Sequence, residues 1–225
     1  MKRLLRFVFP PLCMHCKEDA GDQRKYFCAS CVSLFALIEF EERCKRCFLP
    51  LGECSFCREG GYPFALLAAA MEYQGPIATL VQNFKYHNKP YLAKDAAALL
   101  VLQYVKLNWP LPDVIIPTPQ SLTRSFARGY NPAFLLAQET GKLLGCPVEN
   151  PLKRLSGDLP QAVLNREQRE KLDRNTFRLK KQIDINEKVV LLIDDVRTTG
   201  TTLRHCGTLL KEGFPRALYG MTLCM

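Results

Sequence analysis

The stretch Val189-Val-Leu-Leu-Ile-Asp-Asp-Val-Arg-Thr-Thr-Gly-Thr-Thr-Leu203 decides the fold of this 225-residue chain. The residues from 188 to 193 are almost all apolar and show no polar alternation, which is typical of a strand that is covered on both faces in a parallel sheet. Asp194 and Asp195 end this strand, a loop of small residues follows, and a helix is expected over 201–212, where Gly213 stops it. The stretch therefore predicts a strand–loop–helix unit.

Further elements alternate in the same way on both sides of this unit. Apolar residues at helical spacing, with prolines suited to a first helical turn, predict three more helices. They start at Pro76, run from Pro90 to about Leu107, and cover 132–144. Short apolar strands are expected at 113–117 and 217–223. Alternating strands and helices predict an α/β fold with a largely parallel sheet.

The loop after the acid pair has the chemistry of a site for a phosphorylated sugar. Ligands of open α/β sheets bind beyond the carboxyl ends of the strands. Free N–H groups at a helix start hold a phosphate, and a glycine lets the main chain approach closely. Two carboxylates can accept hydrogen bonds from a sugar diol, directly or through Mg²⁺-bound water. Phosphate and diol together indicate a ribose 5-phosphate.

This stretch resembles the phosphoribosyl-pyrophosphate (PRPP) loop of the type I phosphoribosyltransferases. The resemblance implies that Asp194 and Asp195 bind the ribose and Mg²⁺, and that a five-residue loop binds the 5-phosphate: Thr198, Thr199, Gly200, Thr201 and Thr202. It also implies a parallel sheet with helices on both faces and a small hood. The implied activity is pentosyl transfer, a glycosyltransferase reaction, from PRPP to an acceptor that the sequence does not identify.

Motifs in the rest of the chain extend the resemblance to the ComF/GntX family of competence proteins. The order is four Cys-x-x-Cys pairs, Phe84-Lys-Tyr86, Pro117-Thr-Pro119, Arg128-Gly-Tyr-Asn131 and then the loop. The resemblance implies a small zinc-ribbon domain before a phosphoribosyltransferase-like domain, and a role in DNA uptake and natural transformation. Two positions depart from the family pattern: Pro132 replaces a glutamine, and Arg197 replaces an apolar residue and adds a cation beside the phosphate loop.

The middle of the chain offers further anion ligands. The pyrophosphate is expected to contact the end of the 113–117 strand and two arginines that would share one helix face: Pro117, Thr118, Pro119, Arg124 and Arg128. The segment 153–178 resembles the hood of the fold. Its basic residues, and a lysine outside it, are expected to close over the ligand or to line a groove for single-stranded DNA: Lys85, Arg154, Arg166, Arg169 and Arg174. Phe126 and Tyr130 could stack bases there.

Eight of the 11 cysteines fall before residue 58. They form four Cys-x-x-Cys pairs, which suit two structural tetrahedral zinc ions: Cys13, Cys16, Cys28, Cys31, Cys44, Cys47, Cys54 and Cys57. The short gaps favour sequential pairing, and an interleaved cross-brace, disulfides or an iron–sulfur cluster are the alternatives. Composition changes near Gly60-Gly61, so we expect a double zinc-ribbon domain over 1–62 and a phosphoribosyltransferase-like domain over 63–225.

The formal net charge of +9, of which +7 lies in 63–225, favours a phosphate-rich partner. The sequence contains no apolar run long enough for a transmembrane span, and the N-terminal apolar stretch is too short for a secretory signal, so we expect a cytoplasmic protein. The expected partners are PRPP, single-stranded DNA and a competence helicase or DNA-processing protein. A non-catalytic module for DNA or a helicase is the alternative, and a nucleotide-sensing regulator is a weaker one.

Overall fold

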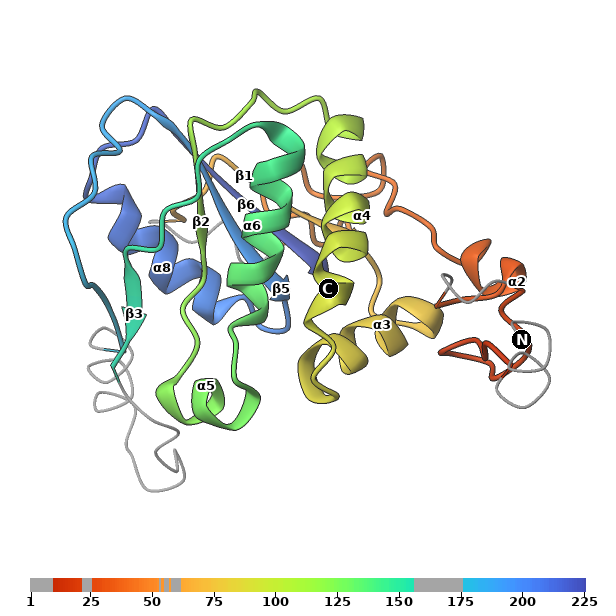
Figure 1. Cartoon of the computed structure of the whole chain (residues 1–225). Coiled ribbons are helices and arrows are strands. Elements are labelled where there is room, and N and C mark those ends of the chain that lie inside the picture. Colours follow the sequence, from red (N-terminus) through yellow and green to blue (C-terminus); the bar gives the residue numbers. More distant parts are fainter. Residues whose placement is uncertain (1–9, 22–25, 53, 55–56, 58–61, 156–175) are drawn as a thin grey trace, which may run out of the picture.

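Four parallel strands form the centre of the fold in this computed structural model, which describes residues 10–21, 26–52, 54, 57, 62–155 and 176–225 (Figure 1). The strand order is β1-β6-β5-β2. The bounds are Leu66–Met71 for β1, Val114–Pro117 for β2, Val189–Val196 for β5 and Ala217–Cys224 for β6. Leu191 of β5 pairs with Ile115 of β2 and with Tyr219 of β6. The central place of β5 explains its unbroken apolar sequence.

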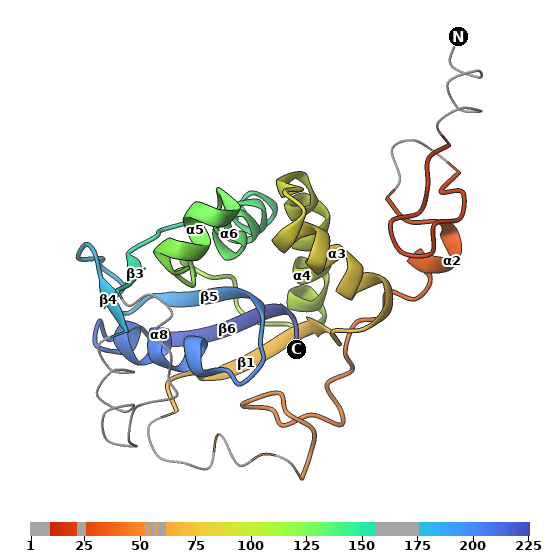
Figure 2. The same ribbon diagram turned by 90° about the horizontal axis from the view of Figure 1, so that it is seen from below.

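Helices cover both faces of this sheet, as the sequence predicts. Helices α4 (Ala93–Lys106) and α6 (Pro132–Leu144) pack against Leu191 and Ile193. Helix α8 (Thr201–Lys211) packs against the alternate residues Val190 and Leu192. Figure 2 shows α3, α4 and α6 on one side of the sheet and α8 on the other. Successive side chains of a strand point to opposite faces, so the apolar run of β5 contributes to the core on each face of the sheet.

The remaining elements lie around the sheet. Helix α3 (Gly75–Tyr86) and the 3₁₀ turn η1 (Pro90–Leu92) lead into α4, and α5 (Leu122–Arg128) lies between β2 and α6. A separate antiparallel pair joins β3 (Leu152–Arg154) to β4 (Phe177–Leu179). The short helix α2 (Ala29–Val32) belongs to the cysteine-rich segment. Most of the predicted hood, residues 156–175, lies outside the described residues.

The helices and strands predicted from periodicity are confirmed, with one refinement: the segment from Pro90 begins as a 3₁₀ turn before α4. Strand β1 was not predicted. Its sequence, Leu-Leu-Ala-Ala-Ala-Met, consists of good helix formers, but pairing with β6 makes it a buried strand. Strands β3 and β4 were also not predicted, because three-residue strands carry too little periodicity.

The cysteine-rich segment packs onto the sheet and its helices. Cys13, Phe27 and Cys31 share an apolar cluster with Ile77 and Leu80 of α3. A second cluster joins Cys47 and Tyr62 to residues of β5 and α8. The boundary expected near residue 62 stays a prediction. None of the helices in the described part of the chain is long and apolar enough to span a bilayer.

Candidate functional site

The candidate site lies where β2 and β5 end side by side. The N–H of Thr118 donates to the carbonyl of Ile193 at 2.9 Å, so the residues after β2 lie next to the acid pair that ends β5. Asn131 holds this arrangement from the start of α6. Its Nδ2 donates to the Thr118 carbonyl at 2.9 Å, and its Oδ1 accepts from the N–H of Ala133 at 3.1 Å. The side chain therefore caps α6 and fixes the chain after β2.

A cavity of about 240 Å³ opens at this edge of the sheet. Nine of the residues predicted as ligands line it: Lys85, Thr118, Pro119, Arg128, Arg154, Asp194, Asp195, Thr198 and Thr202. The other predicted residues do not appear among its lining. Of these, Arg166, Arg169 and Arg174 lie outside the described residues, and the side chain of Arg124 is not described either. The ligand roles of all these residues stay predictions.

Two of the other lining residues matter for the chemistry of the cavity, Asn131 and Gln120. Asn131 was noted only as part of a motif, and Gln120 lies in the segment 117–121 expected to meet the pyrophosphate but had no role of its own. Both side-chain amide atoms of Gln120 are buried and have no hydrogen-bond partner among the residues that the structure describes. A buried amide without partners is costly, which makes this side chain suited to contact a polar ligand. The only signal in the sequence was its place directly after Pro117-Thr-Pro119.

Lys85, from the last turn of α3, forms an ion pair with the acid pair. Its Nζ lies 2.8 Å from Oδ1 of Asp195, and both side chains are largely buried. The same Oδ1 accepts the N–H of Val196 at 2.7 Å, and the N–H of Asp195 donates to Oδ1 of Asp194 at 2.9 Å. The carboxylates are thus oriented by the backbone, and one of them is neutralised by a lysine 110 positions earlier in the chain.

Asp194 is the carboxyl group with an unusual affinity for a proton. Burial, with repulsion by Asp195, raises its pKa from 3.8 to about 7. Hydrogen bonds from the Thr118 side chain and the Asp195 backbone, and the charge of Lys85, act in the opposite direction and limit the rise. At neutral pH the protonated and ionised forms of Asp194 are therefore both populated. A cation that binds beside the group would favour the ionised form and displace the proton.

The loop 198–202, which we call the phosphate loop, leads from the acid pair into α8. Gly200 adopts φ +74°, the left-handed region that suits glycine, and it occupies the N-cap position of α8. Glycine offers no side chain to cap the helix. The N–H of Thr201 has only a long contact of 3.5 Å with Oγ1 of Thr199. Donors of the first helical turn thus remain available to an anion.

Arg197 does not lie where its position in the sequence predicted. It was expected to add a cation beside the phosphate, but its side chain is buried and does not line the cavity. Its Nη1 donates to the carbonyl oxygen of Cys47 at 2.5 Å. The expectation was wrong because alternation along the extended chain and packing against the cysteine-rich segment direct the side chain into the interior.

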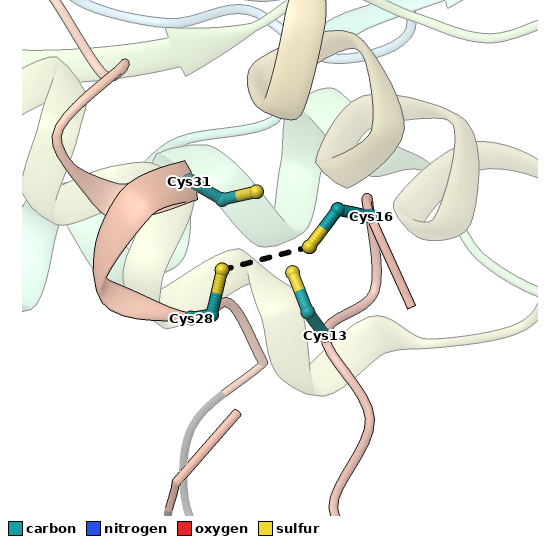
Figure 3. Close-up of side chains that lie close together, drawn as sticks. All are labelled: Cys13, Cys16, Cys28 and Cys31. Carbon is teal, nitrogen blue, oxygen red and sulfur yellow. Dashed lines mark hydrogen bonds between the residues drawn. The ribbon is translucent and has the colours of Figure 1, made fainter. Parts of the chain in front are cut away.

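The cysteines form two clusters of four in the sequential arrangement, which rules out the interleaved cross-brace among the described residues. The first cluster is Cys13, Cys16, Cys28 and Cys31 (Figure 3), and the second is Cys44, Cys47, Cys54 and Cys57. Within each, the four sulfurs lie within 4.8 Å of one another. The Cys16–Cys28 sulfurs are 3.6 Å apart, and in the second cluster the Cys54–Cys57 sulfurs are 2.8 Å apart and the Cys44–Cys57 sulfurs 3.6 Å. Two sulfurs on one tetrahedral zinc ion lie about 3.8 Å apart, so each set of four converging cysteines could hold zinc, with Cys54 and Cys57 moving apart in the second.

The first cluster contacts α3, the helix that carries Lys85. Nδ1 of His15 lies 2.8 Å from Oγ1 of Thr79, so this histidine points at the helix and is not a member of the cluster. Met14 and Tyr26 pack against a small apolar cluster that contains Phe84, the residue before Lys85. The first cluster therefore supports the helix that brings Lys85 to the cavity. The second cluster lies beside Arg197, the residue that precedes the phosphate loop.

A second hollow, of about 780 Å³, adjoins the first and shares Lys85, Tyr86 and Arg128 with it. Phe126 lines it and is 87% exposed, while Tyr86 is 70% exposed. The guanidinium of Arg128 lies 5.1 Å from the centre of the Tyr86 ring. Tyr130 differs from Phe126, because its hydroxyl donates to the Phe84 carbonyl and its ring packs on Phe84.

The raised pKa of Asp194 predicts a pH-dependent stability. The folded protein holds a proton that the unfolded chain releases between about pH 4 and 7, so this group's contribution to the free energy of unfolding falls as pH rises through that window. Asp194→Asn, which cannot ionise, should gain stability relative to the natural chain between pH 5 and 8 in urea titrations. Asp184→Asn, at an exposed position, is the control. Parallel curves for the natural chain and Asp194→Asn would contradict the prediction.

No family model matches the chain. Solved structures with a similar arrangement include the allosteric regulatory enzyme of purine biosynthesis (TM-score 0.44, 17% identity, 64% of this chain and 30% of that one). A purine phosphoribosyltransferase from Pyrococcus horikoshii has a TM-score of 0.41 and 17% identity, over 59% of this chain and 73% of that one.

Curated relatives match nearly the whole chain. Competence protein F of Haemophilus influenzae is 29% identical over 89% of this chain and 90% of its own. The DNA utilization protein YhgH of Salmonella typhi is 28% identical over 96% of this chain and 97% of its own, and that of Escherichia coli K12 is 25% identical over the same shares. These similarities confirm the resemblance to the ComF family that the motifs indicated.

Proposed function

We propose that the cavity at the ends of β2 and β5 binds PRPP with Mg²⁺, in a protein that serves the uptake and processing of single-stranded DNA in natural transformation. The observation that carries the proposal is the convergence of an acid pair, an uncapped helix start and three cationic side chains on one cavity. These groups match a sugar diol, a terminal phosphate and a diphosphate. The names of the curated relatives, a competence protein and DNA utilization proteins, support the cellular role.

The phosphate loop would hold the 5-phosphate. Thr198 and Thr202 face the cavity from the two ends of the loop. Their hydroxyls, with the N–H groups of the first turn of α8, can surround three phosphate oxygens, and the positive end of the helix dipole favours the charge. Gly200 keeps the centre of the loop free of a side chain. The 5-phosphate would thus be recognised mainly by uncharged donors.

The opposite side of the cavity would hold the diphosphate. Arg128 from α5 and Arg154 from β3 both line it, and guanidinium groups can bind phosphate oxygens in pairs. Thr118 and Gln120 add neutral polar groups from the chain after β2. A ligand oxygen or hydroxyl at Gln120 would satisfy the buried amide that has no partner within the described part of the chain.

Asp194 and Asp195 fit a hydrated Mg²⁺, since paired carboxylates with water are ligands that this ion prefers. Mg²⁺ would neutralise diphosphate charge as the leaving group departs. Within the chain, the backbone fixes both carboxylates and Lys85 neutralises Asp195 until the ligand arrives. Asp194 would lose its proton to solvent water when a cation binds beside it. A lysine that can turn from carboxylate to diphosphate would assist the same departure.

Substitutions in the acid pair test this proposal. Asp195→Asn should weaken PRPP binding in the presence of Mg²⁺ by about 10- to 100-fold in calorimetric titration, because each hydrogen bond to a charged group contributes about 1.5–3 kcal/mol. Arg128→Gln should weaken it about 10-fold for the same reason. The control, Asp184→Asn, removes a carboxylate whose side chain is 81% exposed and far from the cavity lining. An absence of PRPP binding by the natural chain, or full binding by Asp195→Asn, would overturn the proposal.

A second candidate function is supported by the larger hollow. Exposed aromatic rings and a stacked arginine beside a positively charged region are suited to bind a single strand, because every base can stack on them. This candidate needs no catalysis: the fold would serve as a module that binds DNA or a helicase partner. The two candidate sites overlap, since Lys85, Tyr86 and Arg128 line both cavities, so a bound strand and PRPP would use some of the same side chains.

Substitution of the exposed aromatic residues tests whether bases stack in the larger hollow or whether the strand is held by charge alone. Tyr86→Ala and Phe126→Ala should each weaken binding of a fluorescent single-stranded oligonucleotide by about 5- to 100-fold, as expected for the loss of one stacked base at about 1–3 kcal/mol. Phe214→Ala, at a position 75% exposed in a different turn, should have no effect. Anisotropy titrations at several salt concentrations give the affinities. Equal affinities for all three variants would exclude a stacking groove at this place.

We infer that both cysteine clusters hold structural zinc, since four cysteines leave no open position for water. Elemental analysis of the purified full chain should therefore find about two zinc ions per chain, and Cys13→Ser and Cys44→Ser should each lower the content to about one. Cys146→Ser, outside both clusters, is the matched control. A zinc content near one in the natural chain, or iron with acid-labile sulfide, would contradict this assignment.

A further inference from the structure

Arg197 is a buried cation that lies between the phosphate loop and the second cysteine cluster. It follows the acid pair directly and precedes the phosphate loop, and only 5% of its surface is exposed. Its backbone N–H donates to the carbonyl of Cys224 at 2.9 Å, and its Nη1 donates to the carbonyl of Cys47 at 2.5 Å. The residue thus joins the start of the phosphate loop both to the end of β6 and to the second cluster.

The charge of this side chain requires a counter-charge. An unpaired buried ion is strongly unfavourable, and the usual solution is a carboxylate. Arg197 has no ion pair with a carboxylate in the described part of the chain, and its guanidinium contacts the main chain of Cys47. A member of the second cluster therefore lies directly against the charge. Four thiolates around one Zn²⁺ carry a net charge of −2, and Cys47 supplies both one of these thiolates and the carbonyl that Arg197 contacts.

We propose that Arg197 is the counter-ion of the zinc-loaded second cluster and that this pairing positions the phosphate loop. The side chain neutralises part of the charge of the cluster, and the cluster holds the residue that begins the loop. Zinc in this cluster would then be linked to ligand binding at a loop that begins 151 positions after Cys47 in the sequence, through the side chain of Arg197.

The two cysteine clusters should differ in how they are connected to the cavity. The first cluster reaches the site through α3, by the contact of His15 with Thr79 and the packing of Met14 on the apolar cluster that contains Phe84. The second reaches the phosphate loop through Arg197. Loss of charge at position 197 should therefore affect one zinc ion of the two. The part of the inference that concerns the loop rests on the proposed binding of PRPP, whereas the pairing with the cluster does not.

Zinc release from the full chain tests the pairing. Arg197→Met keeps most of the side-chain volume and removes the charge, and Arg197→Lys keeps the charge. With excess chelator and a colorimetric indicator, we expect one of the two zinc ions to leave Arg197→Met at least 10-fold faster than the natural chain, and Arg197→Lys to fall between them. Arg216→Met, a change of the same kind at a position with 63% side-chain exposure, should release both ions at the natural rates.

PRPP affinity tests the effect on the loop. Arg197→Met should bind PRPP with Mg²⁺ about 10-fold more weakly, as should Cys44→Ser, and the double variant should be no weaker than either single one, because both changes break the same connection. If Arg197→Met does not fold, the PRPP affinities of Arg197→Lys and of the natural chain are compared while a chelator removes the zinc.

The outcomes separate the two proposals. Natural rates of zinc release from Arg197→Met would overturn the pairing. Faster release with unchanged PRPP affinity, or additive losses in the double variant, would overturn the positioning of the loop. If the natural chain binds no PRPP at all, the proposed function is wrong, while the zinc-release comparison still decides whether Arg197 pairs with the cluster.

Discussion

The parallel pairing of β5 with β2 and β6 is the constraint on which the rest of the structure depends. Parallel strands end at the same edge of a sheet, so this pairing brings the chain after Pro117 next to the acid pair, although some 75 residues separate them in sequence. It also starts α8 directly beyond that edge, with Thr202 of its first turn lining the cavity. The apolar side chains of β5 make the pairing stable, because both of its faces are buried beneath helices.

Electrostatic balance at this edge is achieved with groups from distant parts of the chain. Two adjacent carboxylates in a partly buried place repel each other, which raises the proton affinity of Asp194. Lys85 offsets the charge of Asp195. Arg128 and Arg154 come from α5 and β3 and add positive charge to the cavity lining. The cavity thus combines acidic and basic side chains, which suits a ligand that carries both hydroxyl groups and phosphates.

The cysteine-rich segment supports this cavity from two directions. Its first cluster lies against α3, and its second lies against the residue that begins the phosphate loop. A segment this short has little room for a core of its own, so metal at its eight cysteines would supply much of its folding energy. Such metal would stabilise more than the segment itself, because Cys13 and Cys47 belong to the two apolar clusters on opposite faces of the sheet.

Local patterns were sufficient to predict β5, α8, the acid pair and the four cysteine pairs, because each depends on residues that are close together in the chain. Strand β1 could not be predicted, since its alanines favour a helix until β6 pairs with them. The contact between Lys85 and Asp195, the buried amide of Gln120 and the inward direction of Arg197 were likewise decided by tertiary structure. Side-chain type and spacing indicate which chemistry is present, but only the packing of distant elements determines which charge meets which partner.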